Sequence, residues 1–267
     1  MRVYSLTYHD IVAVGEEESS GFRGPGAAIY KLSTAHFEQH IKAITAAADL
    51  RGVDRSLTAL DVRSTTSESL VLLHFDDGGS AALATADRLE RYGWRGHFHI
   101  TTDFLGKGGF LKPADVRALH DRGHVIGSHS CSHPTMMAAL PRQSLLDEWS
   151  DSKAILSDIV GAEVVVASLP GGFNSAAVSQ SAGDAGIRIL FNSEPNARIQ
   201  RIGKCDILGR YSVQRATQAG VVAQIISGRV MPRWKQSAFW AAKKIAKRVG
   251  GRHWLTAREW ILRQRQS

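Results

Sequence analysis

Short apolar runs alternate with segments of helical spacing through the middle of the chain. Residues 81–92 place Leu83, Ala86 and Leu89 on one face, and Gly93 ends the pattern. Strand-like runs at 70–73, 96–101, 123–129 and 163–167 are separated by expected helices at 81–92, 113–122 and 141–160. Repeated strand and helix units predict an α/β fold with a parallel sheet or barrel, and exclude a β-sandwich.

The two ends of this region are less uniform. After residue 167 we expect a helix at 175–186 and strands at 188–191 and 206–213. Within residues 1–69 the clearest element is a helix capped by Ser33, whose apolar residues share one face. The charged, glycine-rich stretch 16–26 is expected to be an exposed, mobile loop that could cover a site.

Composition and length are those of a globular protein with one sizeable core, at 267 residues and 43% hydrophobic content. Two cysteines, Cys131 and Cys205, cannot form a disulfide framework and lack the CxxC spacing of a zinc knuckle. No signal-like segment and no apolar run of membrane-spanning length occurs, so a cytoplasmic location is expected.

The positive charge is concentrated at the C-terminus. Residues 229–267 carry eleven Lys and Arg against Glu259, a net charge of +10, so the net +8 of the chain leaves −2 for the rest. We therefore expect a domain at 1–228 and a basic tail of amphipathic helices at 229–267, split near Gly250 and Gly251.

Docking on the domain is the simplest role for this tail. An anionic membrane surface is a sharper alternative, because basic faces with tryptophan favour interfaces. The protein would then be membrane-peripheral. Nucleic acid is the least expected partner, because the basic charge belongs to a terminal appendage.

Two polar clusters follow predicted strands. Asp76 and Asp77 come directly after the 70–73 run, and His129 and His133 follow the 123–129 run. Four residues apart on a helical turn, the two imidazoles would lie on one side, and two histidines with a carboxylate form an open zinc set. Taken alone, the aspartates could be a solvated turn, but the histidines at another strand end favour a hydrolytic metal site.

Three motifs in order bring a family into view: FDDGG at 75–79, GHVIGSHSCSHP at 123–134 and SLPGG at 168–172. They resemble the polysaccharide deacetylases of the NodB-homology type, also called carbohydrate esterase family 4, over about residues 3–215. The opening LTYH at 6–9 is similar to members linked to exopolysaccharide synthesis, so the resemblance adds a polysaccharide-synthesis complex at the membrane surface to the partners considered for the tail. The resemblance implies a distorted (β/α) barrel and a metal-dependent hydrolase that removes N-acetyl groups from a saccharide or polysaccharide precursor.

The resemblance also implies residue roles. Asp76 matches the general base of the family, and the metal ligands would be Asp77, His129 and His133, with zinc as the default ion. The backbone donor to the oxyanion would come from the segment Pro170, Gly171 and Gly172, through the N–H of either glycine.

Two departures from the family pattern stand out. Ser168 occupies the place of an arginine that orients the base; Arg210 could substitute for it, or be a surface salt-bridge partner. The late Leu-x-His that supplies the general acid has no match, because His253 in the basic tail is the only later histidine. The general acid is therefore unknown.

Two other functions stay open at this point. One is a catalytically degenerate saccharide-binding or scaffold protein of the same fold, which the missing arginine and histidine suggest. The other is a deacylase of a small non-carbohydrate amide, since the site chemistry does not depend on what lies beyond the carbonyl. An intact set of three ligands argues for an enzyme.

Overall fold

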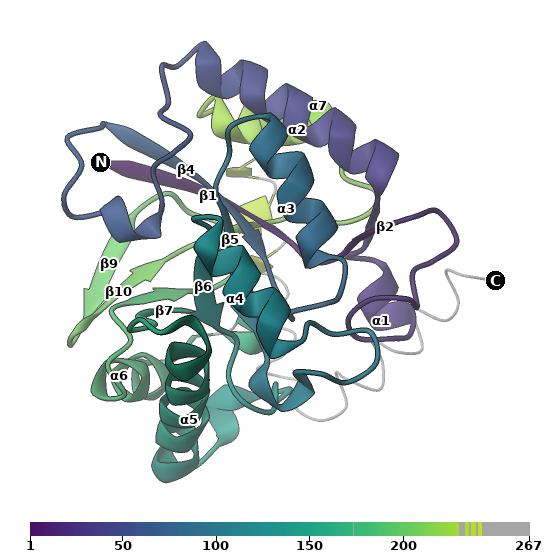
Figure 1. Cartoon of the computed structure of the whole chain (residues 1–267). Coiled ribbons are helices and arrows are strands. Elements are labelled where there is room, and N and C mark those ends of the chain that lie inside the picture. The colour runs from purple at the N-terminus through teal and green to yellow at the C-terminus, as the bar shows by residue number, and fades with distance from the viewer. Residues whose placement is uncertain (173, 230–232, 235, 239, 242–267) are drawn as a thin grey trace.

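A single nine-stranded sheet forms the centre of the protein (Figure 1). This computed structural model describes residues 1–172, 174–229, 233–234, 236–238 and 240–241. The strand order is β11-β1-β4-β5-β6-β7-β8-β10-β9, and every pair is parallel except β10 with β9. β11 and β9 are the two edges, so the sheet follows the order of a barrel without closing.

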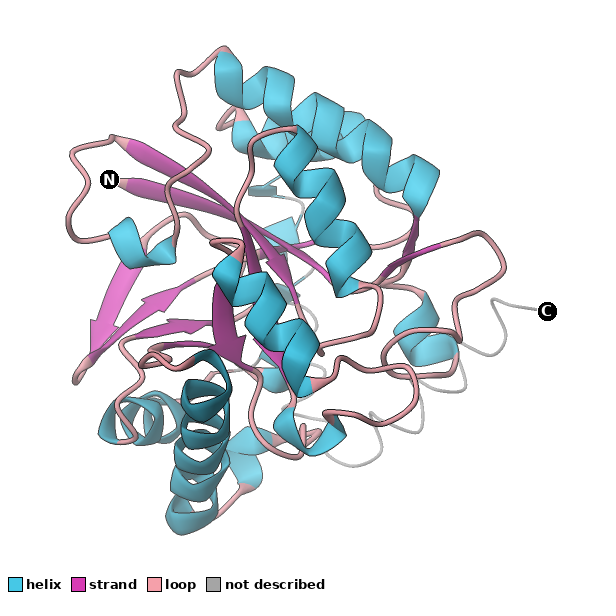
Figure 2. Ribbon diagram, viewed as in Figure 1, coloured by secondary structure: helices cyan, strands magenta, loops and turns pink. Residues whose placement is uncertain are grey.

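As far as β8, successive strands of this sheet are joined by segments that contain helices, and these helices cover the outer face of the sheet (Figure 2). The nine strands are β1 Arg2–Tyr8, β4 Ser69–Phe75, β5 Gly96–Ile100, β6 Val125–Ser128, β7 Val166–Ser168, β8 Ile189–Phe191, β9 Ile199–Ile202, β10 Cys205–Leu208 and β11 Tyr211–Ser212. A two-stranded sheet pairs β2 Ile11–Val12 with β3 Leu32–Ser33.

The α-helices are α1 Pro25–Ala28, α2 Thr34–Asp49, α3 Ala82–Arg91, α4 Pro113–Asp121, α5 Arg142–Val160, α6 Ala176–Asp184 and α7 Ala219–Ile226. The helices expected at 81–92, 113–122, 141–160 and 175–186 are α3 to α6. The hydroxyl of Ser33 accepts a hydrogen bond from the N–H of His36, so the predicted cap of α2 is confirmed.

Strand β1 of the sheet was not predicted from the sequence, and one predicted strand was wrong. Residues 1–69 contain β1, the second strand from one edge, whose Leu6 pairs with Leu73 of β4. The strand expected at 206–213 is two strands on different sides of the sheet: β10 pairs with β8, and β11 pairs with β1. The break falls at Gly209, where an added Cβ would lie 2.1 Å from the carbonyl oxygen of Glu194.

The described residues after 228 pack on the rest of the protein. Gln236 Nε2 donates to Ser212 O at 3.3 Å, and Ser237 Oγ donates to Pro195 O at 3.0 Å. The expected docking of the tail on the domain therefore holds for these residues, and the boundary at 228 stays a prediction. The helix break near residue 250 and the proposed membrane contact lie outside the described residues. Among the helices that the structure describes, none has the length and apolarity to cross a membrane.

Candidate active site

The two aspartates lie in the turn that follows β4. Asp76 and Asp77 are both buried, and the backbone N–H of Asp76 donates to Tyr8 O at 3.1 Å. Asp77 has a φ of 80°, in the left-handed region where residues other than glycine and asparagine are uncommon. Gly79 allows the turn to pack on Asp10, because an added Cβ there would lie 1.9 Å from Asp10 Oδ1. The carboxylates are thus held at the carboxyl end of β4 and away from solvent.

The two histidines follow β6 in an irregular loop. The helical turn expected for His129 and His133 is wrong, because Ser130 and His133 have φ values of 62° and 58°. Ser130 Oγ accepts from the His133 N–H at 3.1 Å. The Glu148 carboxylate on α5 accepts from the N–H of Cys131 at 2.8 Å. Two positive φ values and these side-chain hydrogen bonds bring the imidazoles together without a helix.

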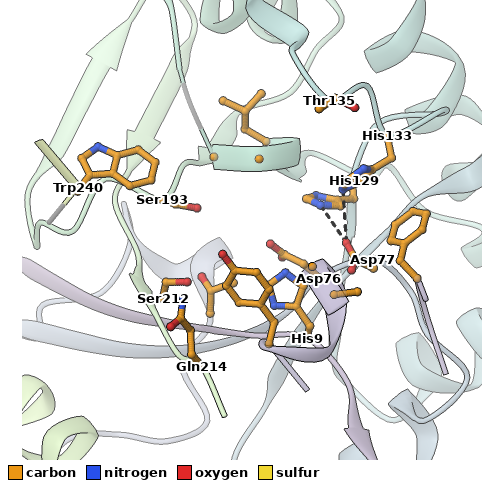
Figure 3. A pocket seen from close by; sticks show the side chains of 18 of the residues that line it. His9, Asp76, Asp77, His129, His133, Thr135, Ser193, Ser212, Gln214 and Trp240 are labelled. Carbon is orange, nitrogen blue, oxygen red and sulfur yellow. Dashed lines mark ion pairs between the residues drawn. The ribbon is translucent and has the colours of Figure 1, made fainter. Parts of the chain in front are cut away.

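Asp77, His129 and His133 converge in space as predicted (Figure 3). One nitrogen or oxygen of each lies within 4.8 Å of the others. The distances from Asp77 Oδ1 are 3.4 Å to His129 Nε2 and 3.5 Å to His133 Nε2. His129 Nδ1 lies 2.9 Å from Ser168 O, so this nitrogen carries the proton and Nε2 can act as a ligand.

The donor set fits a divalent cation. Asp77 Oδ1 is buried without a hydrogen-bond partner among the described residues. Burial raises the pKa of Asp77, but His9, His129 and His133 outweigh it and lower the pKa. Burial lowers the pKa of His133 to about 4, so this imidazole is neutral at physiological pH. An anionic carboxylate and neutral imidazoles are the ligands that zinc binds.

Asp76 is held by a buried arginine. Arg210 Nη1 donates to Asp76 Oδ1 at 2.8 Å, and Ser168 Oγ donates to Oδ2 at 3.2 Å. Arg210 is 1% exposed and also donates from Nε to Asn192 O at 3.0 Å. The surface alternative for Arg210 is therefore wrong. Burial raises the pKa of Asp76, but the Arg210 charge and the nearby imidazoles hold it well below its usual value.

The 3-10 turn Pro170–Gly172 lies beside the pocket that contains the aspartates and histidines. Gly171 and Gly172 line this pocket, whereas Pro170 is buried and does not line it. The Gly172 N–H donates to Leu169 O at 2.9 Å and is thereby occupied. The Gly171 N–H has no such partner in the described part of the chain, and the φ of Gly171 is 67°. Of the predicted oxyanion donors, Gly171 is the one with a free N–H.

His9 belongs to the site, and sequence reasoning did not assign it a role. It follows β1 directly, lines the pocket and stacks on Tyr30 with ring centroids 4.7 Å apart. Its Nδ1 is buried and without a partner among the described residues. Its position follows from strand pairing, because neighbouring parallel strands end on the same side of a sheet. Tyr8 of β1 pairs with Phe75 of β4, so the next residues, His9 and Asp76, lie side by side.

His9, the two aspartates, the two histidines, Gly171 and Gly172 line one pocket of about 710 Å³, which is within the range of small-molecule sites. The ligand set occupies one end of it (Figure 3). At the opposite side lie Trp240, Gln214 and Ser212 (Figure 3). This far side is polar and aromatic, and part of it comes from the C-terminal segment.

Comparison with known proteins indicates the family to which part of this chain is similar. Residues 63–190 match the family model described as Polysaccharide deacetylase. This segment, 128 of the 267 residues, is therefore a polysaccharide deacetylase domain, and that family supports a hydrolytic enzyme. No curated protein matched it at the required significance.

Solved structures show the same fold at low identity. A polysaccharide deacetylase from Bacillus cereus is 17% identical with a TM-score of 0.67, covering 85% of this chain and 69% of its own. IcaB from Ammonifex degensii is 18% identical with a TM-score of 0.68, covering 85% and 97%. A de-N-acetylase from Aggregatibacter actinomycetemcomitans is 16% identical with a TM-score of 0.67, covering 84% and 100%. The α/β fold expected from the sequence, of the NodB deacetylase type, is confirmed.

Proposed function

We propose that the protein is a metal-dependent hydrolase that removes N-acetyl groups from a saccharide. The observation that carries this proposal is the convergence of three ligand side chains beside a spare carboxylate that is paired with a buried arginine. A divalent cation held by Asp77, His129 and His133, with zinc our default, would polarise the acetamide carbonyl and lower the pKa of a water molecule.

Asp76 would accept the proton of the attacking water. Arg210 and Ser168 fix both of its oxygens, so the carboxylate is anionic at physiological pH and has one orientation. The Gly171 N–H is available to donate a hydrogen bond to the oxyanion as the tetrahedral intermediate forms. Asp76 and Gly171 would thus supply the base and the oxyanion donor for the attack of water on the acetyl carbon.

The leaving amine needs a proton before the C–N bond breaks. We assign this donor to His9, whose buried Nδ1 has no other partner among the described residues and which faces the same pocket as Asp76. The water supplies a hydroxyl to the acetyl group, and the amine leaves protonated, so the products are acetate and a free amino sugar. His9 therefore fills the role for which the sequence offered no residue.

A saccharide substrate is supported by the far side of the pocket. Ser212, Gln214 and Gln236 offer hydrogen-bonding groups, and Trp240 offers an apolar ring, a combination that suits a hydroxylated ring better than a small apolar amide. The degenerate scaffold is less well supported than it was from sequence. The scaffold was suggested by the absence of the family's arginine and of its general acid. In our proposal Arg210 takes the place of the arginine and His9 that of the acid.

The test is to measure acetate release and metal content on the same purified protein. The substrates are N-acetylglucosamine oligomers with β-1,4 and β-1,6 links, an O-acetylated xylan and a small N-acetyl amide. We expect one bound divalent ion and acetate release from the N-acetylated saccharides. A protein that binds an ion but releases acetate only from the small amide supports the non-carbohydrate alternative. A protein that is inert with every ion supports the scaffold.

A further inference from the structure

The glycine-rich stretch 16–26, which the sequence suggested to be an exposed, mobile loop, is held from inside by a buried lysine. Lys31 is 2% exposed. Its Nζ donates to three backbone carbonyls: Glu17 O at 2.5 Å, Ser20 O at 2.6 Å and Phe22 O at 2.5 Å. An ammonium group has three N–H donors, and all three are used here. A buried charge is costly without such partners. The Lys31 ammonium group therefore holds the three carbonyls, and with them the loop backbone, in place.

Further contacts tie the same loop to the turn that carries the aspartates. Ser20 Oγ donates to Asp10 Oδ1 at 2.6 Å and accepts from the N–H of Ala81 at 2.9 Å. The Gly21 N–H donates to Gly109 O at 2.7 Å. Burial raises the pKa of Asp10 to about 6, although the hydrogen bond from Ser20 and the charge of Lys31 both lower it. The expectation of an exposed loop is therefore wrong at Ser20 and Gly21, which are buried, and its mobility stays a prediction.

The loop delivers one aromatic ring to the candidate ligands. The ring of Phe22 lies 4.7 Å from that of His133, centroid to centroid, and 4.8 Å and 5.2 Å from Phe104 and Phe110. His133 needs such support more than His129 does. His129 Nδ1 contacts Ser168 O, whereas His133 Nδ1 has no hydrogen-bond partner among the residues that the structure describes. Packing on Phe22 therefore takes the place of the hydrogen bond that usually orients a ligand imidazole.

We propose that Lys31 is a positioning residue of the active site: by gathering three loop carbonyls it holds Phe22 against His133 and fixes the orientation of that imidazole. The inference rests on the proposed metal site, and it adds a residue that touches neither the metal ligands nor the pocket. Lys31 acts through Phe22, so its effect should disappear once the Phe22 ring is removed.

The test is a double-mutant cycle on the full chain with zinc alone as the probe. Zinc affinity is measured by competition with a chromophoric chelator for wild type, Lys31→Met, Phe22→Ala and the double variant. Lys31→Met keeps the length of the side chain and removes its charge; Lys42→Met, at an exposed position of α2, is the matched control. We expect each single variant to bind zinc about 10- to 100-fold more weakly, as for the loss of a group that orients a ligand.

The double variant should show no further loss, because both substitutions break one chain of contacts. Lys31→Met with wild-type affinity, or losses that multiply in the double variant, would overturn the proposal. A purely structural lysine would lower the thermal midpoint of the metal-free protein and leave its zinc affinity unchanged. If Lys31→Met does not fold, Phe22→Leu and Phe22→Ala are compared instead. Phe22→Leu should keep the zinc affinity and Phe22→Ala should lose it. Equal affinity in the two variants would overturn the proposal.

Hydrogen exchange on the metal-free protein separates this inference from the proposed function. Amides of residues 17–24 should exchange faster in Lys31→Met than in Lys42→Met. If the wild type binds no divalent ion, the proposed function is wrong, and the exchange result still decides whether Lys31 holds the loop. Unchanged exchange in Lys31→Met would overturn the clamp itself.

Discussion

The candidate site has two halves that are built in different ways. The ligand half, Asp77, His129 and His133, comes from two turns that directly follow β4 and β6, two inner strands separated by β5 alone. The half around Asp76 takes His9 from the end of β1 and Arg210 from the link between β10 and β11. β1 and β11 are adjacent only because the chain returns at its end to the first strand.

This difference shows what short motifs can and cannot encode. A ligand set can be carried by two short motifs at strand ends, because a cation needs only a few donor atoms within one small radius. A base with a fixed orientation needs partners on more than one side, and the fold supplies them from distant strands. The two halves should therefore fail in different ways: loss of a ligand removes the metal, and loss of an Asp76 partner keeps the metal and lowers the rate.

The largest effect is expected in the ligand half. Asp77→Ala, His129→Ala and His133→Ala each remove a ligand that the remaining two cannot replace, so we expect loss of bound metal and of acetate release. Metal content after dialysis is measured by mass spectrometry, with Asp121→Ala at an exposed position as control. Full metal content in any of the three variants would exclude that residue from the ligand set.

The next largest effect concerns Arg210. Arg210→Met leaves Asp76 buried without its charged partner, which costs about 3 to 5 kcal/mol of unfolding free energy. Arg63→Met is the control: Arg63 is 60% exposed and its partner Asp206 keeps Arg201, so we expect a much smaller loss of unfolding free energy. Chemical denaturation of both variants measures the difference. Equal costs would show that burial of the Asp76 pair does not matter.

The same substitution predicts a change in pH dependence. The folded pKa of Asp76 lies below its unfolded value, so the pair stabilises the protein above about pH 4 and this contribution is lost as pH falls through the folded pKa. Without Arg210, burial dominates and the pKa of Asp76 rises. The acidic limb of the rate profile should therefore move to higher pH in Arg210→Met. An unmoved limb would contradict the proposed base.

A smaller effect, selective for the substrate, is expected for His9. His9→Gln removes the proposed acid and should slow N-deacetylation about 100-fold while metal content stays at wild-type level. An acetate ester of p-nitrophenol has a leaving group that needs no proton, so its hydrolysis should be nearly unaffected. Equal losses on both substrates would show that His9 does not protonate the leaving group.

The smallest effect is expected at the far side of the pocket. Trp240→Ala should raise KM for an N-acetylglucosamine oligomer about 2- to 10-fold with little change in kcat. Trp234→Ala is the matched control, because Trp234 lies in the same segment, is 63% exposed and does not line the pocket. The same KM in both variants would remove Trp240 from substrate binding.

The ligand half and most of the fold could be predicted from the sequence, for local reasons. The central strands are short apolar runs between good helix formers, and their ends place Asp76, Asp77 and His129 at one edge of the sheet. Strand β1 was missed because Ser5 and Thr7 interrupt its apolar residues, although both are buried in the structure. The helical turn at 129–133 was wrong because two positive φ values cannot be read from the residues Ser130 and His133.

The half around Asp76 could be predicted only in part. Arg210 was one candidate with an open alternative, because nothing next to it in sequence indicates that it is buried. The break at Gly209 depends on contact with Glu194 O, which belongs to a different part of the chain. His9 was not assigned because its neighbourhood depends on the pairing of β1 with β4. Residues whose roles depend on which strands become neighbours need the fold.

The most direct test of the account is made on the variant Asp76→Asn. Metal content and acetate release from an N-acetylglucosamine oligomer are measured on one preparation. The separation of the two halves predicts a wild-type amount of metal, because Asp77, His129 and His133 are intact, together with loss of acetate release, because an amide cannot accept the proton of water. Full activity, or loss of the metal, would contradict it.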